Sequence, residues 1–177
     1  MKRSWIVFSA VLILLLGGCA TSPGLRGNDQ ALPLDQVDLN LQKQLPVTRK
    51  ASFGSVKIVG MLLQSSLDKK SMEIPVKFVL TSYEIPEGIE GLIVYRGGLR
   101  YVPETRTLYL SDPEPLRLTF GNPSLEEYVS ASARKGIAAL VGSALQSLPL
   151  QTMPESFRAH TIEKFAIEKE KLLIDFK

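Results

Sequence analysis

The stretch Met72-Glu73-Ile74-Pro75-Val76-Lys77-Phe78-Val79-Leu80 alternates between two kinds of side chain. Its even-numbered positions are all apolar, while Glu73 and Lys77 fall on the other face. This period of two predicts a half-buried β-strand. Because a polar turn at 68–71 precedes it and a Pro-Glu-Gly turn at 86–88 follows it, the strand is expected to pair with its neighbours through short connections.

Three further segments around this strand, 55–64, 89–101 and 107–120, also have strand-like patterns. Residues such as Gly60 and Pro113 interrupt them, and such residues inside strands indicate bulges or bends. Four long strands joined by short turns predict an antiparallel meander with strong curvature.

The period changes to that of a helix after this meander. Asn122 is a suitable N-cap and Pro123 suits the first turn. Apolar side chains then recur at helical spacing as far as Leu148, which predicts one long amphipathic helix over 123–148.

Small residues on this helix leave room for another group to come close. Gly136, Ala139 and Gly142 present almost no side chain. The partner is either the sheet, in ordinary helix-on-sheet packing, or a ligand chain. The sequence leaves both interpretations open.

The two ends of the folded region add smaller elements. Residues 34–44 predict a short helix capped by Asp35, with a strand as the alternative because the leucines there also alternate. Near the C-terminus, residues 165–176 predict a hairpin around a Lys-Glu-Lys turn, with a short helix at 154–163 before it.

These elements predict an α+β fold in a single domain, residues 32–177. A highly curved antiparallel β-sheet would wrap around one long α-helix in the C-terminal half. A short N-terminal helix and a C-terminal hairpin complete the predicted arrangement.

The N-terminus has the features of a secretory signal. Lys2 and Arg3 precede an apolar run at 5–16, which is shorter than the roughly 20 residues that a membrane span requires. The small residues of Leu16-Gly17-Gly18-Cys19 suit a peptidase cleft, and this pattern resembles the lipobox of bacterial lipoproteins. An ordinary secretory signal with an incidental cysteine is the alternative.

Cysteine usage favours lipidation. Cys19 is the only cysteine in the chain, so no intrachain disulfide forms, and acylation would remove a lone thiol from an oxidising compartment. We therefore expect residues 1–18 to be cleaved and Cys19 to anchor the protein to a membrane through its acyl chains, palmitate among them. Residues 19–31 would form the lipidated cysteine and a flexible tether.

The residues after Cys19 predict which membrane carries the anchor. Ala20, Thr21 and Ser22 do not include the aspartate that retains enterobacterial lipoproteins at the inner membrane. By that rule we expect the outer membrane, on its periplasmic face, rather than the inner membrane.

Charge excludes a nucleic-acid surface. Removing Lys2 and Arg3 from the 21 basic residues leaves 19 against 18 acidic ones, a net charge of +1. The charges alternate in sign along the chain, whereas nucleic-acid binding needs clustered Lys and Arg.

The order of elements resembles that of the YceB-like bacterial lipoproteins, a family without an assigned activity. The segments 99–120 and 165–176 carry most of this resemblance, which covers the mature chain as a pattern of elements. It implies a fold similar to the tubular lipid-binding (TULIP) domains, in which an apolar groove lies between helix and sheet. The chain departs from its relatives at 149–154, a short segment marked by prolines that bears on the closure of one groove end.

We find no catalytic constellation, and we expect neither an enzyme nor a bound metal or cofactor. His160 is the only histidine, and lipidation would consume the only thiol. The chain contains no Gly-x-Ser-x-Gly elbow and no phosphate-binding glycine loop. Neighbouring acidic residues, such as Glu126 and Glu127, are those of a solvated surface.

Two function classes follow from the apolar helix. In the first, the groove holds a lipid or another apolar ligand. In the second, side chains of the protein fill the groove, and the lipoprotein supports an envelope assembly by binding a protein partner. The predicted groove residues lie on both walls: Val76, Phe78, Leu80, Val94 and Leu108 from the sheet, and Ile137, Leu140, Val141, Gly142 and Leu145 from the helix.

Overall fold

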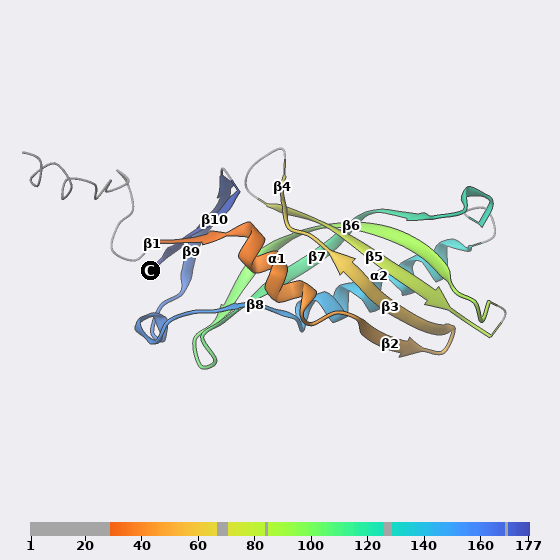
Figure 1. Ribbon diagram of the computed structural model, residues 1–177, viewed down its shortest axis with the longest axis horizontal. Coiled ribbons are helices and arrows are strands. Elements are labelled where there is room, and N and C mark those ends of the chain that lie inside the picture. The colour runs from red at the N-terminus through yellow and green to blue at the C-terminus, as the bar shows by residue number, and fades with distance from the viewer. Residues whose placement is uncertain (1–28, 67–70, 84, 126–128, 169) are drawn as a thin grey trace, which may run out of the picture.

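One large antiparallel sheet dominates the computed structural model, which describes residues 29–66, 71–83, 85–125, 129–168 and 170–177 (Figure 1). The strand order is β2-β3-β5-β6-β7-β8, and the short strand β4 pairs with β5. The strands are β2 (Val47–Ala51), β3 (Gly54–Met61), β4 (Gln64–Ser65), β5 (Met72–Thr81), β6 (Ile89–Val102), β7 (Thr107–Phe120) and β8 (Pro149–Thr152). The four predicted long strands thus correspond to β3, β5, β6 and β7.

The balance of helix and strand corrects the predicted fold class. Strands make up 54% of the structure, so the protein is mostly β, and the α+β prediction is wrong. The sheet is a curled half-barrel, and the described residues include only two α-helices, both short: α1 (Leu34–Gln42) and α2 (Ala131–Gln146). The long helix predicted over 123–148 has 16 residues instead.

Two capping residues explain why α2 is shorter than the apolar pattern. The side chain of Asn122 accepts a hydrogen bond from the backbone N–H of Ser124 at 3.0 Å, and the described residues that follow it form the 3-10 turn η2 (Pro123–Leu125). The Oγ of Ser130 accepts one from the N–H of Ala133 at 3.2 Å and caps α2. Both residue types favour helix starts, so the sequence could not tell which of them begins the long helix.

A second, smaller sheet joins the two ends of the described chain. Its strands are β1 (Asp29–Pro33), β9 (Ile162–Glu168) and β10 (Lys171–Phe176), with β10 in the middle. The predicted terminal hairpin is therefore β9–β10, and β1 adds to it as a third strand (Figure 1). The predicted tether, 19–31, overlaps β1 at its last three residues. The signal segment 1–18 and Cys19 lie outside the described residues.

The short helices differ in detail from their predicted form. Residues 34–42 form the helix α1 rather than the alternative strand, and β1 ends just before it. Asp35 is not its cap, because its carboxylate accepts from the adjacent N–H of Gln36 at 2.8 Å and Pro33 takes the N-cap position. The helix predicted at 154–163 is only a 3-10 turn, η3 (Glu155–Phe157). None of the helices in the described ranges is long and apolar enough to cross a bilayer.

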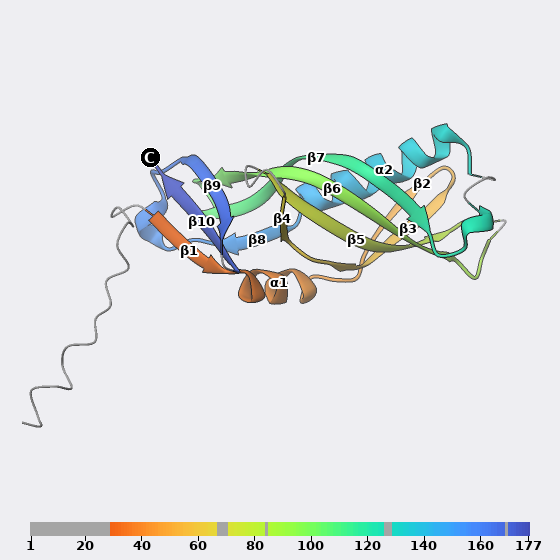
Figure 2. The same ribbon diagram turned by 90° about the horizontal axis from the view of Figure 1, so that it is seen from above.

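Helix α2 spans the opening of the half-barrel. It contacts β2 and β3 on one flank and β7 on the other, although β2 and β7 are well separated in the strand order. Figure 2 shows α2 running beside β7, with β7 ending and α2 beginning at the same end of the molecule. The buried side chains of helix and sheet form one core, with Ile74 and Ile93 at 0% exposure and Val141 at 1%.

A glycine on β6 makes room for the ring of Phe78 in this core. Gly91 pairs with Phe78 on β5, and a Cβ built on Gly91 would lie 2.3 Å from the Phe78 ring. The same ring packs edge-to-face on Phe120, with a centroid distance of 6.1 Å. Phe78 therefore lies flat against the backbone of β6, where no side chain fits beneath it.

We expect Gly91→Ala to lower the free energy of unfolding by about 1–3 kcal/mol, since the new methyl group must displace the Phe78 ring. The matched control is Gly60→Ala on β3, where a Cβ would meet only Lys77 side-chain atoms at 3.8 Å. That variant should change stability by less than about 0.5 kcal/mol. Urea unfolding of the full chain measures both. Equal effects of the two substitutions would contradict the packing described for Phe78.

Candidate apolar groove

Most of the predicted groove residues belong to the closed core. Side chains from both predicted walls are nearly inaccessible: Val76 and Leu108 at 0%, Phe78 at 1%, Leu80 at 8%, Ile137 and Val141 at 1% and Leu145 at 0% exposure. They belong to one cluster of buried side chains that includes residues of both walls. At these positions the self-filled interpretation of the helix–sheet contact describes the structure.

Val94 and Leu140 lie elsewhere. Val94 is partly exposed, while its neighbours Ile93 and Tyr95 are fully buried, so Val94 points to the outer face of the sheet. Leu140 is half-buried at the margin of the core. Of the ten predicted residues, only Gly142 lines the groove that the structure contains.

That groove lies outside the core, between α2 and the far half of β7, and has a volume of about 500 Å³. The wall from β7 consists of Pro113, Pro115, Leu116, Arg117 and Leu118. The wall from α2 consists of Arg134, Lys135, Ala138, Ala139, Gly142, Ser143 and Gln146. The volume falls in the range of small-molecule pockets, roughly 300–1,000 Å³.

The groove exists because β7 is only partly paired on this side. Strand β8 pairs with β7 only from Thr107 to Tyr109, so the rest of β7 has no strand neighbour there among the described residues. Pro113 and Pro115 cannot donate to another strand, and prolines are typical of protected sheet edges. The proline-marked segment 149–154 supplies β8 and so limits one end of this free edge.

Tyr95 joins α2 to the sheet beneath the groove. Its hydroxyl donates to the carbonyl of Ala138 at 2.6 Å, and its side chain is fully buried. Burial raises the pKa of Tyr95 above its usual range, and the nearby backbone N–H of Gly142 offsets this in part. A Cβ on Gly142 would lie 3.5 Å from the Tyr95 ring and 3.7 Å from Pro113, so helix and sheet are in close contact here.

The small residues of α2 have different surroundings. A Cβ on Gly136 would meet the ring of Phe53 at 3.3 Å, so close packing against the β2–β3 turn accounts for that glycine. Ala138 is 7% exposed and forms part of the core as well as the groove floor. Ala139 is exposed and lines the groove, so additional bulk at Ala139 would fill the groove without entering the core.

Cations from both walls border the groove. Arg117 comes from β7, and Arg134 and Lys135 come from α2. The Nε of Arg134 donates to the carbonyl of Val129 at 3.2 Å, which holds this side chain near the start of the helix. Within the described ranges no acidic side chain lines the groove, and none forms an ion pair with Arg117 or Lys135.

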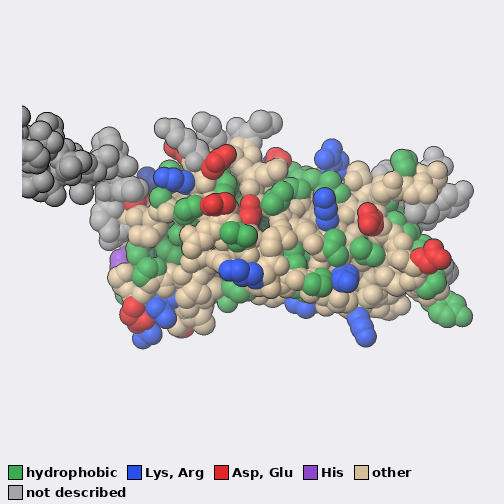
Figure 3. Space-filling model, viewed as in Figure 1, with side chains coloured by type: hydrophobic (Ala, Val, Ile, Leu, Met, Phe, Trp, Pro, Cys, Tyr) green, Lys and Arg blue, Asp and Glu red, His purple; other side chains and the backbone are tan. Residues whose placement is uncertain are grey.

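A second hollow, of about 400 Å³, is lined by parts of β3, β5, β6 and β7, and the predicted groove residue Phe78 is among its lining residues. Lys77 and Glu90 both line it, so it has no excess of one charge. The face of the molecule seen in Figure 3 likewise mixes basic and acidic side chains without a block of either sign. Neither the second hollow nor the face in Figure 3 concentrates charge of one sign as the α2–β7 groove does.

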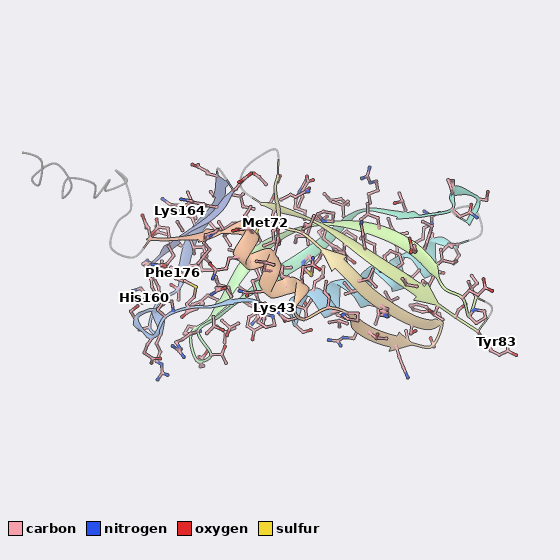
Figure 4. The ribbon with its side chains drawn as sticks, in the orientation of Figure 1. Lys43, Met72, Tyr83, His160, Lys164 and Phe176 are labelled. Carbon is pink, nitrogen blue, oxygen red and sulfur yellow. The ribbon has the colours of Figure 1, made fainter. Side chains whose placement is uncertain are left out.

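The ring of His160 packs against other aromatic rings, away from the α2–β7 groove. Its ring lies 5.4 Å from that of Phe157 and 6.4 Å from that of Phe176, beside the small sheet (Figure 4). Among the described residues, no group of three or more His, Cys, Asp or Glu side chains is placed to hold a metal ion.

Comparison with known proteins adds no relative. The sequence matches no protein-family model, and no curated protein matches it. The resemblance to the YceB-like lipoproteins therefore stays a prediction.

Proposed function

We propose that this protein is a periplasmic lipoprotein, anchored to the outer membrane through Cys19, that binds the acyl chain of a lipid in the groove between α2 and β7. The observation that carries the proposal is an open groove of about 500 Å³ next to, and separate from, a fully packed core. The protein acts by binding rather than by catalysis. Its likeness to YceB-like lipoproteins and to tubular lipid-binding domains is part of the same proposal.

The walls of the groove suit an acyl chain. Leu116 and Leu118 face Ala138, Ala139 and Gly142 across it, and prolines complete the β7 wall. Leu116 is 41% exposed, so its side chain is accessible to a ligand in the groove. Each methylene group buried there contributes about 0.8 kcal/mol, so a chain of about ten methylenes gains enough to offset the cost of association.

The groove permits a test that leaves the core intact. We expect a photoreactive residue, p-benzoylphenylalanine, to form an acyl-lipid adduct when it replaces Ser143, which is exposed and lines the groove. The same replacement at Ser132, exposed on α2 but not among the groove-lining residues, should form none. Irradiation of cells that express the full chain, followed by mass spectrometry of the tryptic peptides, measures both.

Filling the groove should abolish the adduct. In the protein that carries p-benzoylphenylalanine in place of Ser143, we expect Ala139→Trp to reduce the yield of the lipid adduct about tenfold or more. The reason is that the indole displaces at least two methylene groups of the ligand. Ser132→Trp is the matched control on the same helix and should leave the yield unchanged. Because Ala139 is exposed, unfolding in urea should shift by less than about 0.5 kcal/mol. An absent adduct, or one equally strong from Ser132, would contradict lipid binding and favour a role in envelope assembly.

A further inference from the structure

We propose that the occupant of the groove is a long-chain fatty acid, whose carboxylate is held by Arg117 and Lys135 and whose chain extends toward Gly142. This inference depends on the proposed function, because it names the ligand of the same groove. It rests on the distribution of charge along the two walls.

The cations gather at one end of the groove. Pro113 lies against Gly142, 3.7 Å from a Cβ built there, so these two residues mark one position on both walls. Arg117 is four residues further along β7, about 10 Å, because Leu116 is an unpaired bulge residue that shortens the strand there. Lys135 is seven residues back along α2, about 10 Å. Because β7 ends where α2 begins (Figure 2), both displacements have the same direction, and both cations reach the same end.

The opposite end has no charge among its described lining residues. Beyond Gly142 the wall of α2 continues with Ser143 and Gln146, while Ala138, Ala139 and Leu116 lie between the two ends. The groove therefore has a basic end and an apolar middle, which matches an amphiphile with one anionic end. The mature chain would have a net charge of only +1, so general basicity does not account for this concentration.

The position of these cations on α2 strengthens the positive potential. The backbone of a helix carries partial positive charge at its N-terminus, where acidic side chains are usually favourable. The first turn of α2 contains no acidic residue, and Arg134 and Lys135 follow in its first five positions. Side chains and helix dipole thus act in the same direction on an anion bound at this end.

A single chain with a carboxylate fits better than a phospholipid. The volume of about 500 Å³ is in the lower half of the usual range for ligand sites, and only α2 and β7 supply the described walls of this open groove. A guanidinium group pairs with a carboxylate through two parallel hydrogen bonds, and an ammonium group adds a further donor. A diacyl lipid would leave its second chain in water.

The test compares a fatty acid with its uncharged ester. Full-length protein in neutral phosphatidylcholine vesicles is irradiated with diazirine-labelled palmitic acid or with its methyl ester, and labelled peptides are mapped by mass spectrometry. We expect the acid to label the peptides of α2 and β7 about tenfold more than the ester does. Because the charges are exposed, this preference should decline as salt increases.

Charge reversal assigns the effect to residues. The double variant Arg117→Glu, Lys135→Glu should reduce labelling by the acid to the level of the ester, without changing labelling by the ester. The control Lys50→Glu, Lys57→Glu makes the same change of charge at exposed positions of β2 and β3 and should leave both unchanged. Arg117→Lys, which keeps the charge, should retain most of the preference.

Each contrary result identifies what fails. Equal groove labelling by acid and ester would overturn the carboxylate site while leaving acyl binding in place. Absence of groove labelling by both probes would overturn the proposed function itself. Displacement of the acid by lysophosphatidylglycerol at lower concentration than by unlabelled palmitate would replace the fatty acid with a phosphate-bearing lipid as the occupant.

Discussion

A Cys19→Ser protein is expected to lose its acyl modification completely and to accumulate as an unprocessed or soluble product. The hydroxyl of serine cannot replace the thiolate in thioether formation, so neither acylation nor the cleavage that depends on it should occur. Without acyl chains the protein loses the burial of their methylene groups, about 0.8 kcal/mol each, that anchors it. Labelling with radioactive palmitate, followed by fractionation of the cells, measures the change.

Ser22→Ala is the control for this experiment, since it alters a nearby small residue and leaves the Leu16 to Cys19 pattern intact. It should be labelled and recovered in the membrane fraction like the unaltered protein. Palmitate labelling that persists in the Cys19→Ser protein would contradict the lipobox interpretation. An ordinary secretory signal with an incidental cysteine would then be the better description.

The second large effect is expected at Tyr95, which lies where α2, β6 and the groove floor meet. Tyr95→Ala removes a fully buried ring and should lower the free energy of unfolding by about 3–5 kcal/mol. Tyr95→Phe keeps the ring and removes only the 2.6 Å hydrogen bond to the carbonyl of Ala138, so the expected loss is about 1–2 kcal/mol. Urea unfolding of the full chain at neutral pH measures both.

An exposed tyrosine provides the matched control. Tyr83 is 101% exposed and projects from the end of the molecule (Figure 4), so Tyr83→Ala should change stability by less than about 0.5 kcal/mol. If Tyr95→Phe were as stable as the unaltered protein, the hydrogen bond would contribute nothing to the junction of helix and sheet. If Tyr95→Ala had an effect as small as Tyr83→Ala, the described burial would be contradicted.

The raised pKa of Tyr95 adds a pH dependence. An unfolded tyrosine loses its proton near its ordinary pKa of 10.0, whereas the buried phenol keeps it at higher pH. Above about pH 10 the unfolded state therefore binds fewer protons than the folded state, and this part of the stability falls as pH rises. Tyr95→Phe lacks the phenol, so its deficit relative to the unaltered protein should shrink between pH 9 and about pH 11. A constant deficit would contradict this titration.

The prediction of Val94 as a groove wall shows why alternation alone did not identify the inner face of β6. Residues 92–95 are all apolar or aromatic, so a period of two separates them into two faces without showing which is buried. The curl of the half-barrel makes this choice, and it places Ile93 and Tyr95 inward. The contact of Tyr95 with α2 was not predicted, because its partner Ala138 lies 43 positions away in the sequence.

The elements whose formation depends on residues close together in the chain were predictable from the sequence. The alternation of β5, the turns around it and the terminal hairpin follow from side-chain spacing and turn residues, which act over a few positions. The prediction that Cys19 carries an anchor likewise comes from a contiguous pattern. The length of α2 was not determined in this way, because Asn122 and Ser130 are both suitable caps.

The separation of core residues from groove residues is visible only in the folded protein. The apolar stripe of α2 is the same in both interpretations, but folding buries Ile137, Val141 and Leu145 against the sheet and leaves Ala139 in the open groove. The groove also joins Arg117 of β7 to Lys135 of α2, which no local pattern connects. The physical reason is that a cavity forms between surfaces that meet after folding. Its shape and charge depend on how far the sheet curls and where β8 stops pairing with β7.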